Sequence, residues 1–118
     1  MQPSEVDRLV ESSLAGSRSV FTGHVADPGA YLAELESTFR ADRIAPDLQV
    51  VILEREVVEP RLMRGTRTVY FVSRGEPHSV FFDPETQSFG CAWGPALPDG
   101  KYIDLGFRSE DVLEMLSA

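Results

Sequence analysis

Between Leu48 and Leu105 the sequence alternates short apolar runs with turn-forming segments. These segments are Arg64-Gly65-Thr66, Arg74-Gly75-Glu76-Pro77, Asp83-Pro84-Glu85-Thr86 and Pro98-Asp99-Gly100. Gly, Pro and Asp favour tight turns, and Asp followed by Pro is a preferred start of a type I turn. The pattern is typical of an antiparallel β-meander, and we expect about five strands in it.

The apolar runs themselves predict the strands. The expected strands are Leu48–Val58, Arg67–Ser73, Ser79–Phe82, Gln87–Trp93 and Lys101–Leu105. The first begins with a run that is apolar and largely β-branched apart from Gln49, so we expect Leu48 to Leu53 to be buried on both faces. In the fourth, large and small side chains alternate, which predicts the close approach of another element, such as a helix, on the small side.

Helical patterns flank the meander. Ser4 to Leu14 carries apolar residues at helical spacing, and Asp27-Pro28 is a favourable helix start, with Pro46 preventing continuation. Ser109 is expected to cap a final helix. The chain of 118 residues is thus predicted to be one α+β domain, 1–118, with two N-terminal helices, a largely antiparallel meander and a C-terminal helix. Helices on one side would leave the other sheet face partly open.

The chain is acidic, with 19 acidic and 11 basic residues and a net charge of -8. This balance argues against binding to nucleic acids or to anionic membranes and favours a basic protein partner through electrostatic steering. The N-terminus, starting at Met1, has neither the basic region nor the apolar segment of a signal peptide. We therefore expect a cytoplasmic protein.

Motifs for catalysis or cofactor binding are missing from the sequence. It contains no glycine-rich phosphate loop, no nucleophile elbow and no metal-binding spacing of histidines and cysteines, so no cofactor and no metal are expected. The two histidines, His24 and His78, are expected to be ordinary loop and strand-end residues. Cys91, between Phe89 and Trp93, is expected to be a buried structural thiol. An enzyme is therefore not the favoured class, although the sequence leaves it open.

Two groups of residues are candidates for function. Those for a protein interface are Trp93, an aromatic at a strand end, and the acidic residues Glu54, Glu56, Glu59 and Asp104. Those for an anion or another ligand are Arg61, Arg64, Arg67, His78 and Tyr102. The arginines surround an expected hairpin tip from Pro60 to Thr66.

Three classes of function follow. The first is a small acidic module that binds a basic protein, either as an inhibitor in the manner of immunity proteins or as a chaperone. The second is a small-molecule-binding domain or modest enzyme with a pocket on the open sheet face. The third is a regulatory domain that forms homodimers through a sheet edge or the open face. The acidic charge and the lack of catalytic motifs favour the first.

Overall fold

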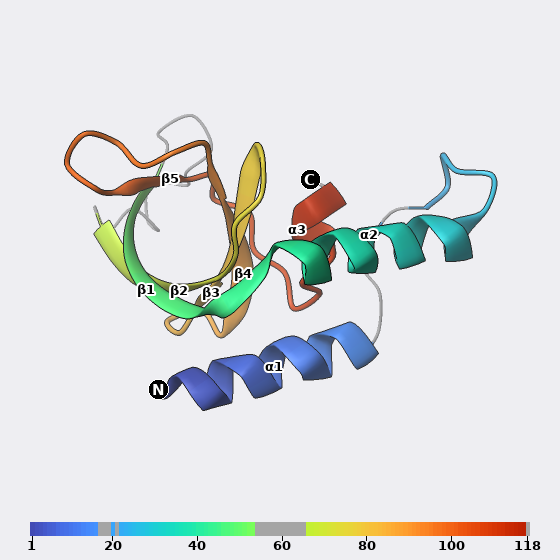
Figure 1. Ribbon diagram of the computed structural model, residues 1–118, viewed down its shortest axis with the longest axis horizontal. Helices are drawn as coiled ribbons and strands as arrows, with labels where there is room; N and C mark the ends of the chain where they lie inside the picture. The colour runs from blue at the N-terminus through green and yellow to red at the C-terminus, as the bar shows by residue number, and fades with distance from the viewer. Residues whose placement is uncertain (17–19, 21, 54–65, 118) are drawn as a thin grey trace.

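The computed structural model describes residues 1–16, 20, 22–53 and 66–117 (Figure 1). In chain order its elements are α1 (Pro3–Ala15), α2 (Pro28–Asp42), β1 (Arg43–Leu53), β2 (Thr66–Ser73), β3 (His78–Asp83), β4 (Ser88–Trp93), β5 (Tyr102–Asp104) and α3 (Glu114–Ser117). The expected α+β class, with two N-terminal helices, a mostly antiparallel set of five strands and a C-terminal helix, is confirmed.

The strands form a closed barrel in the order in which they follow one another along the chain. Neighbours are antiparallel, except that β1 closes the ring by pairing in parallel with β5, Val51–Leu53 against Tyr102–Asp104. Figure 1 shows this ring on one side of the molecule and the three helices on the other. Because the sheet closes on itself, it has an inner face and an outer wall in place of the single open face that we expected.

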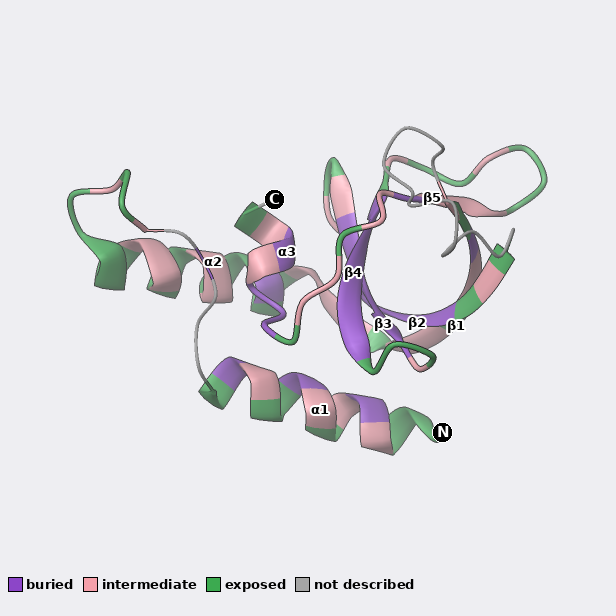
Figure 2. Cartoon of the chain, turned by 180° about the vertical axis from the view of Figure 1, so that it is seen from behind, coloured by how far each residue is buried: buried purple, intermediate pink, exposed green. Residues whose placement is uncertain are grey.

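The helices cover only part of the outer wall. Their apolar side chains pack against outward-facing residues of β2, β3 and β4, and this larger core includes Val6, Val10, Phe39, Tyr70, Val72, Val80, Phe82, Phe89, Cys91, Val112, Leu113 and Met115. Figure 2 shows the buried wall of the barrel turned toward the helices. α1 also lies against the start of β1, where Arg43 forms ion pairs with Asp7 and Glu11, whereas no described helix covers the outer surface of β1 from Leu48 to Ile52 or that of β5.

The barrel interior forms a second, smaller core. Its buried members are Val51, Val69, Phe71, Phe81 and Ala92, and Ile44 and Tyr102 pack against them. The Phe71 ring lies 5.8 Å from that of Phe81 and 4.8 Å from that of Tyr102, measured between centroids. Aromatic and branched side chains therefore fill the inside of the ring.

The prediction that the first strand is buried on both faces is wrong. Leu48 is 54% exposed and Ile52 37% exposed, whereas Val51 between them is 1% exposed. From Leu48 to Ile52 only the inward side of β1 meets the core, because α1 contacts the strand at its start, near Arg43, and the other described helices lie over other strands. β1 also begins earlier than expected, directly after α2, and contains Pro46.

The helix ends agree with the sequence in part. Asp27 caps α2 as predicted, because its Oδ1 accepts a hydrogen bond from the amide of Ala30 at 3.1 Å. The C-terminal helix, however, is shorter than expected and is not capped by Ser109, whose backbone instead pairs with Phe89 of β4. None of the described helices has the length and hydropathy needed to cross a membrane.

The small residues of β4 face the barrel interior, so the predicted close approach is confirmed, but the neighbours are side chains and not a helix. A Cβ placed on Gly90 would lie 2.6 Å from both the Phe81 ring and Nη1 of Arg108. Glycine at this position therefore leaves the space that Arg108 occupies.

We expect Gly90→Ala to lower the free energy of unfolding by about 1–3 kcal/mol, because the added methyl group overpacks the barrel interior. Urea denaturation measures the change. Gly29→Ala is the matched control, since a Cβ there meets only Asp27 Oδ1 at 3.6 Å and should leave stability unchanged or slightly raised. Equal stability of the two variants would contradict the packing at Gly90.

Candidate functional site

Four charged side chains meet at one end of the barrel interior. Arg67 Nη1 and Arg108 Nη2 lie 2.9 and 3.0 Å from Oδ2 of Asp83. The second arginine also reaches Oδ2 of Asp104 at 2.7 Å. Asp83 is 1% exposed and Asp104 is fully buried. We call these four residues the barrel-end network; both of its guanidinium groups are paired with buried carboxylates, and Arg67 Nη1 also lies 3.3 Å from Oε2 of the exposed Glu85.

Arg108 reaches this network from the segment that follows β5. That segment stays beside β4, with the Leu105 amide donating to the Cys91 carbonyl at 3.1 Å. The guanidinium lies 5.0 Å from the Phe81 ring centroid. Burial lowers the pKa of Arg108, but the hydrogen bonds and charges of Asp104 and Asp83 outweigh it, so its pKa is raised and it stays protonated.

A third arginine, Arg74, lies at the opposite end of the interior core. The Arg74 guanidinium is 4.5 Å from the Phe71 ring centroid and 5.0 Å from that of Tyr102. Its Nη2 contacts Asp47 Oδ2 at 2.8 Å. Tyr102, a candidate ligand residue in the sequence, thus packs in an aromatic and cationic cluster that closes this end.

The outer wall of β1 from Leu48 onward and of β5 carries an apolar surface over which none of the described helices lies. The strand register places Ile52 beside Ile103, Ile103 beside Trp93, and Trp93 beside His78. Trp93 is 49% exposed, and its ring lies 5.4 Å from that of His78 between centroids. We call this surface the bare wall and define it as Leu48, Val50, Ile52, His78, Trp93 and Ile103.

The nucleophilic and basic side chains do not converge into a catalytic arrangement within the described residues. Cys91 is buried, and burial raises the pKa of its thiol to about 11. His24 packs edge-on against Tyr31 at 5.5 Å, far along the chain from His78 on the bare wall. The described residues also contain no group of three or more side chains suited to a metal ion.

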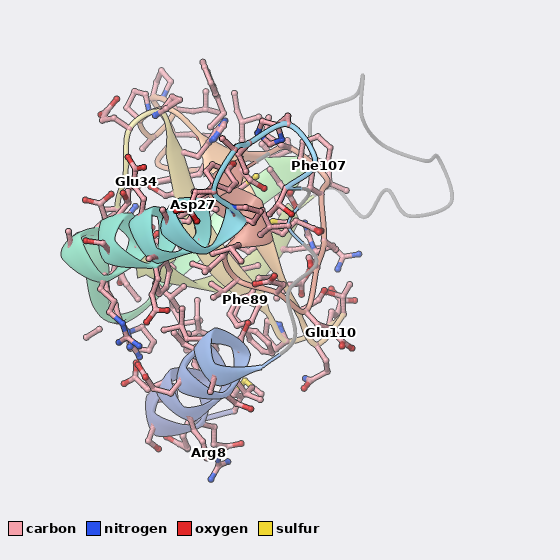
Figure 3. All side chains as sticks on the ribbon, turned by 90° about the vertical axis from the view of Figure 1, so that its right-hand side faces the viewer. Arg8, Asp27, Glu34, Phe89, Phe107 and Glu110 are labelled. Atoms are coloured by element: carbon pink, nitrogen blue, oxygen red, sulfur yellow. The ribbon has the colours of Figure 1, made fainter. Side chains whose placement is uncertain are left out.

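The excess negative charge is carried by carboxylates without a cationic partner. Every described basic side chain except that of Arg8 forms an ion pair with a carboxylate. By contrast, Glu34, Glu76 and Glu110 are exposed and form no ion pair among the described residues. Glu34 and Glu110 lie on the helical side (Figure 3), whereas Glu76 is two residues before His78.

Two sequence candidates lie in places that we did not expect. Asp104 was expected on an acidic surface, but it is buried and paired with Arg108. Arg67 was expected in a basic hairpin tip, but its side chain is 10% exposed and paired with Asp83. The remaining candidates at the tip and strand end lie outside the described residues: Glu54, Glu56, Glu59, Arg61 and Arg64.

Trp93 and His78 were both candidates from the sequence, but their contact was not predicted. Nor did the sequence predict that Ile52 and Ile103 lie beside Trp93 on the bare wall. Strand register brings these four together, and a single sequence carries no signal for it. Comparisons with known protein families, with curated proteins and with solved structures found no match. The class of function therefore rests on the chemistry of the surfaces alone.

We expect Asp104→Asn to destabilise the fold by about 3 kcal/mol or more, because it leaves part of the buried Arg108 charge uncompensated. Urea denaturation of the wild type and the variant gives the difference. Asp99→Asn removes an exposed partner of Lys101 and should produce no measurable change. An Asp104→Asn protein as stable as the wild type would rule out the barrel-end network as a closing contact.

We expect the Cys91 thiol to react with a chromogenic disulfide reagent only when the chain unfolds, since it is buried and protonated at neutral pH. The same reagent in denaturing guanidinium chloride should react at once. The unfolded chain loses this proton near pH 9 and the folded chain near pH 11, so the free energy of unfolding should fall between those values. Rapid labelling of the native protein at pH 7 would contradict this burial.

Proposed function

We propose that this protein is an acidic protein-binding module that docks a basic partner protein on the bare wall. The observation that carries the proposal is the row Ile52, Ile103 and Trp93 on three neighbouring strands, in which the half-buried Ile103 lies between Ile52, 37% exposed, and Trp93, 49% exposed. Contiguous exposed apolar surface on a small folded domain is typical of an interaction site. Its role would be inhibitory or chaperone-like, as a stoichiometric binder requires no catalytic group.

Trp93 is the natural anchor of such an interface. Tryptophan is enriched among the residues that contribute most to binding, because it buries a large area with few rotatable bonds. Its contact with His78 holds the ring against the wall and restricts it before a partner arrives. A partner that covers the ring would remove its 49% exposed fraction from water.

Charge supports a basic partner over an acidic one. Every described Arg and Lys side chain except Arg8 is paired with a carboxylate, whereas Glu76, two residues before His78 of the bare wall, is exposed and unpaired among the described residues. The net charge of -8 would accelerate encounter with a positively charged protein and repel a negatively charged one. The sign of the net charge, together with the apolar row, supports a basic protein as the partner.

The packed barrel interior gives less support to a small-molecule pocket or an enzyme. Aromatic side chains fill the ring, and arginines with paired carboxylates occupy both ends. The buried Cys91, with its raised pKa, is also unsuited to nucleophilic catalysis. A homodimer through the bare wall is the alternative outcome of the binding experiment.

Affinity capture with the tagged protein at low ionic strength tests the proposal. We expect a basic protein in about equal amount, with Trp93→Ala weakening its binding about 30-fold or more. Phe107→Ala is the matched control, because Phe107 is an aromatic of similar exposure, 48%, outside the bare wall. Added salt should lower the association rate.

Equal loss of binding in both variants would contradict a role specific to the bare wall. Recovery of a second copy of this chain as the only bound protein would favour the homodimer instead. Recovery of an acidic partner would reverse the electrostatic part of the proposal.

A further inference from the structure

The edge of β1 that faces β5 is paired over only part of its length. β5 is three residues long and meets β1 at Val51 to Leu53, whereas the other edge of β1 pairs with β2 back to Arg43. Alternate residues of a strand direct their N–H and C=O groups to the same edge. Among the described residues, none pairs with the β5-side edge of β1 over Asp47 to Val50.

The chain leading into β5 turns away from this edge instead of extending the pairing. Leu97 and Lys101 are joined by a 2.7 Å backbone hydrogen bond, which folds the segment before β5 into a tight turn. Figure 1 shows this β4–β5 connection swinging out from the ring. The separation leaves a groove of about 450 Å³, lined by Leu48, Gln49, Val50, Thr68, Asp99, Gly100 and Lys101.

We propose that the partner inserts an extended basic peptide segment into this groove as an added strand on β1. This inference rests on the proposed function and specifies how the partner would be held. Exposed strand edges bind peptides through main-chain hydrogen bonds, and neighbouring side chains supply specificity. Leu48 and Val50 belong to the bare wall, so the added strand would continue the same docking surface.

The dimensions of the groove limit the segment. The unpaired edge from Asp47 to Val50 spans about 13 Å at strand spacing, which accommodates four paired residues. Pro46 has no N–H to donate and ends the usable edge on that side. Side chains of the segment that lie on the outer face would sit beside Leu48 and Val50, and we expect them to be apolar, at every second position.

The charge of the whole molecule selects a basic segment over a second copy of this chain. Within and beside the groove the charges pair off, Lys101 with Asp99 and Arg74 with Asp47. The field at the groove is therefore set by the net charge of -8, which attracts cations. Two copies of the chain would carry that charge toward one another, so edge-to-edge self-pairing is disfavoured.

Selection of twelve-residue peptides from a random phage-displayed library on the immobilised protein tests this inference. We expect enriched peptides with apolar residues at alternate positions and an excess of Lys and Arg. Thr68→Trp should fill the groove and reduce their binding at least tenfold. Ala33→Trp, which adds the same side chain to the exposed face of α2, should not.

A second measurement tests the backbone contacts without altering the protein. A synthetic copy of the strongest peptide, N-methylated along one edge, should bind at least tenfold more weakly than the same peptide N-methylated along the other edge. Amide exchange of alternate residues between Asp47 and Val50 should slow when the unmodified peptide is bound.

Several outcomes would overturn the inference. They are no enriched sequence, enriched sequences without alternation, equal binding of the two methylated peptides, or sedimentation showing a dimer that Thr68→Trp dissociates. The proposed function is judged separately by the captured partner. If Trp93→Ala weakens the captured partner and Thr68→Trp does not, the bare wall binds it without an added strand.

Discussion

The ion pairs of Arg108 with Asp83 and Asp104 link β3 to β5, the short strand whose few backbone hydrogen bonds close the barrel. β5 has three residues, and its parallel pairing with β1 is what closes the ring. Arg108 follows β5 along the chain and binds a carboxylate at the end of β3 and another in β5 itself. A buried charge that loses one partner is strongly unfavourable, so opening the ring here would expose or isolate these charges. Gly90 is the residue that makes room for this contact.

Closure of the ring determines which surface is available to a partner. A flat sheet covered by helices on one face would offer its whole second face, but in the barrel that face is folded inward and filled by Phe71, Phe81 and their neighbours. The helices occupy the outer wall of β2, β3 and β4, so the bare wall remains. The partly paired edge of β1 follows from the shortness of β5, and it borders the bare wall at Leu48 and Val50.

Features that depend on neighbouring residues could be predicted from the sequence. Asp27 capped its helix, Asp83-Pro84 marked the hairpin, and the alternation in β4 separated its two faces, because local chemistry decides each of these. Features that depend on distant residues could not. The parallel pairing of β1 with β5 joins residues about fifty positions apart. The charge of Arg67 was placed on the surface because its partner Asp83 comes from another strand. Asp104 was placed there too, because its burial depends on the closure of the barrel, although its partner Arg108 is only four positions along the chain. The sequence left Trp93 open between the core and an interface at a strand end; it is 49% exposed, and its row of apolar neighbours required the register.

The central claim is that a partner docks on the bare wall and not on the helical side. Site-specific photocrosslinking tests it most directly, with a photoreactive phenylalanine analogue placed either at Leu48, which is 54% exposed, or at the exposed Glu34 of α2. The account predicts that illumination in the native lysate joins a basic protein to the chain from position 48 and leaves position 34 unreacted. A crosslink from position 34 alone would contradict it and would move recognition to the acidic helical side.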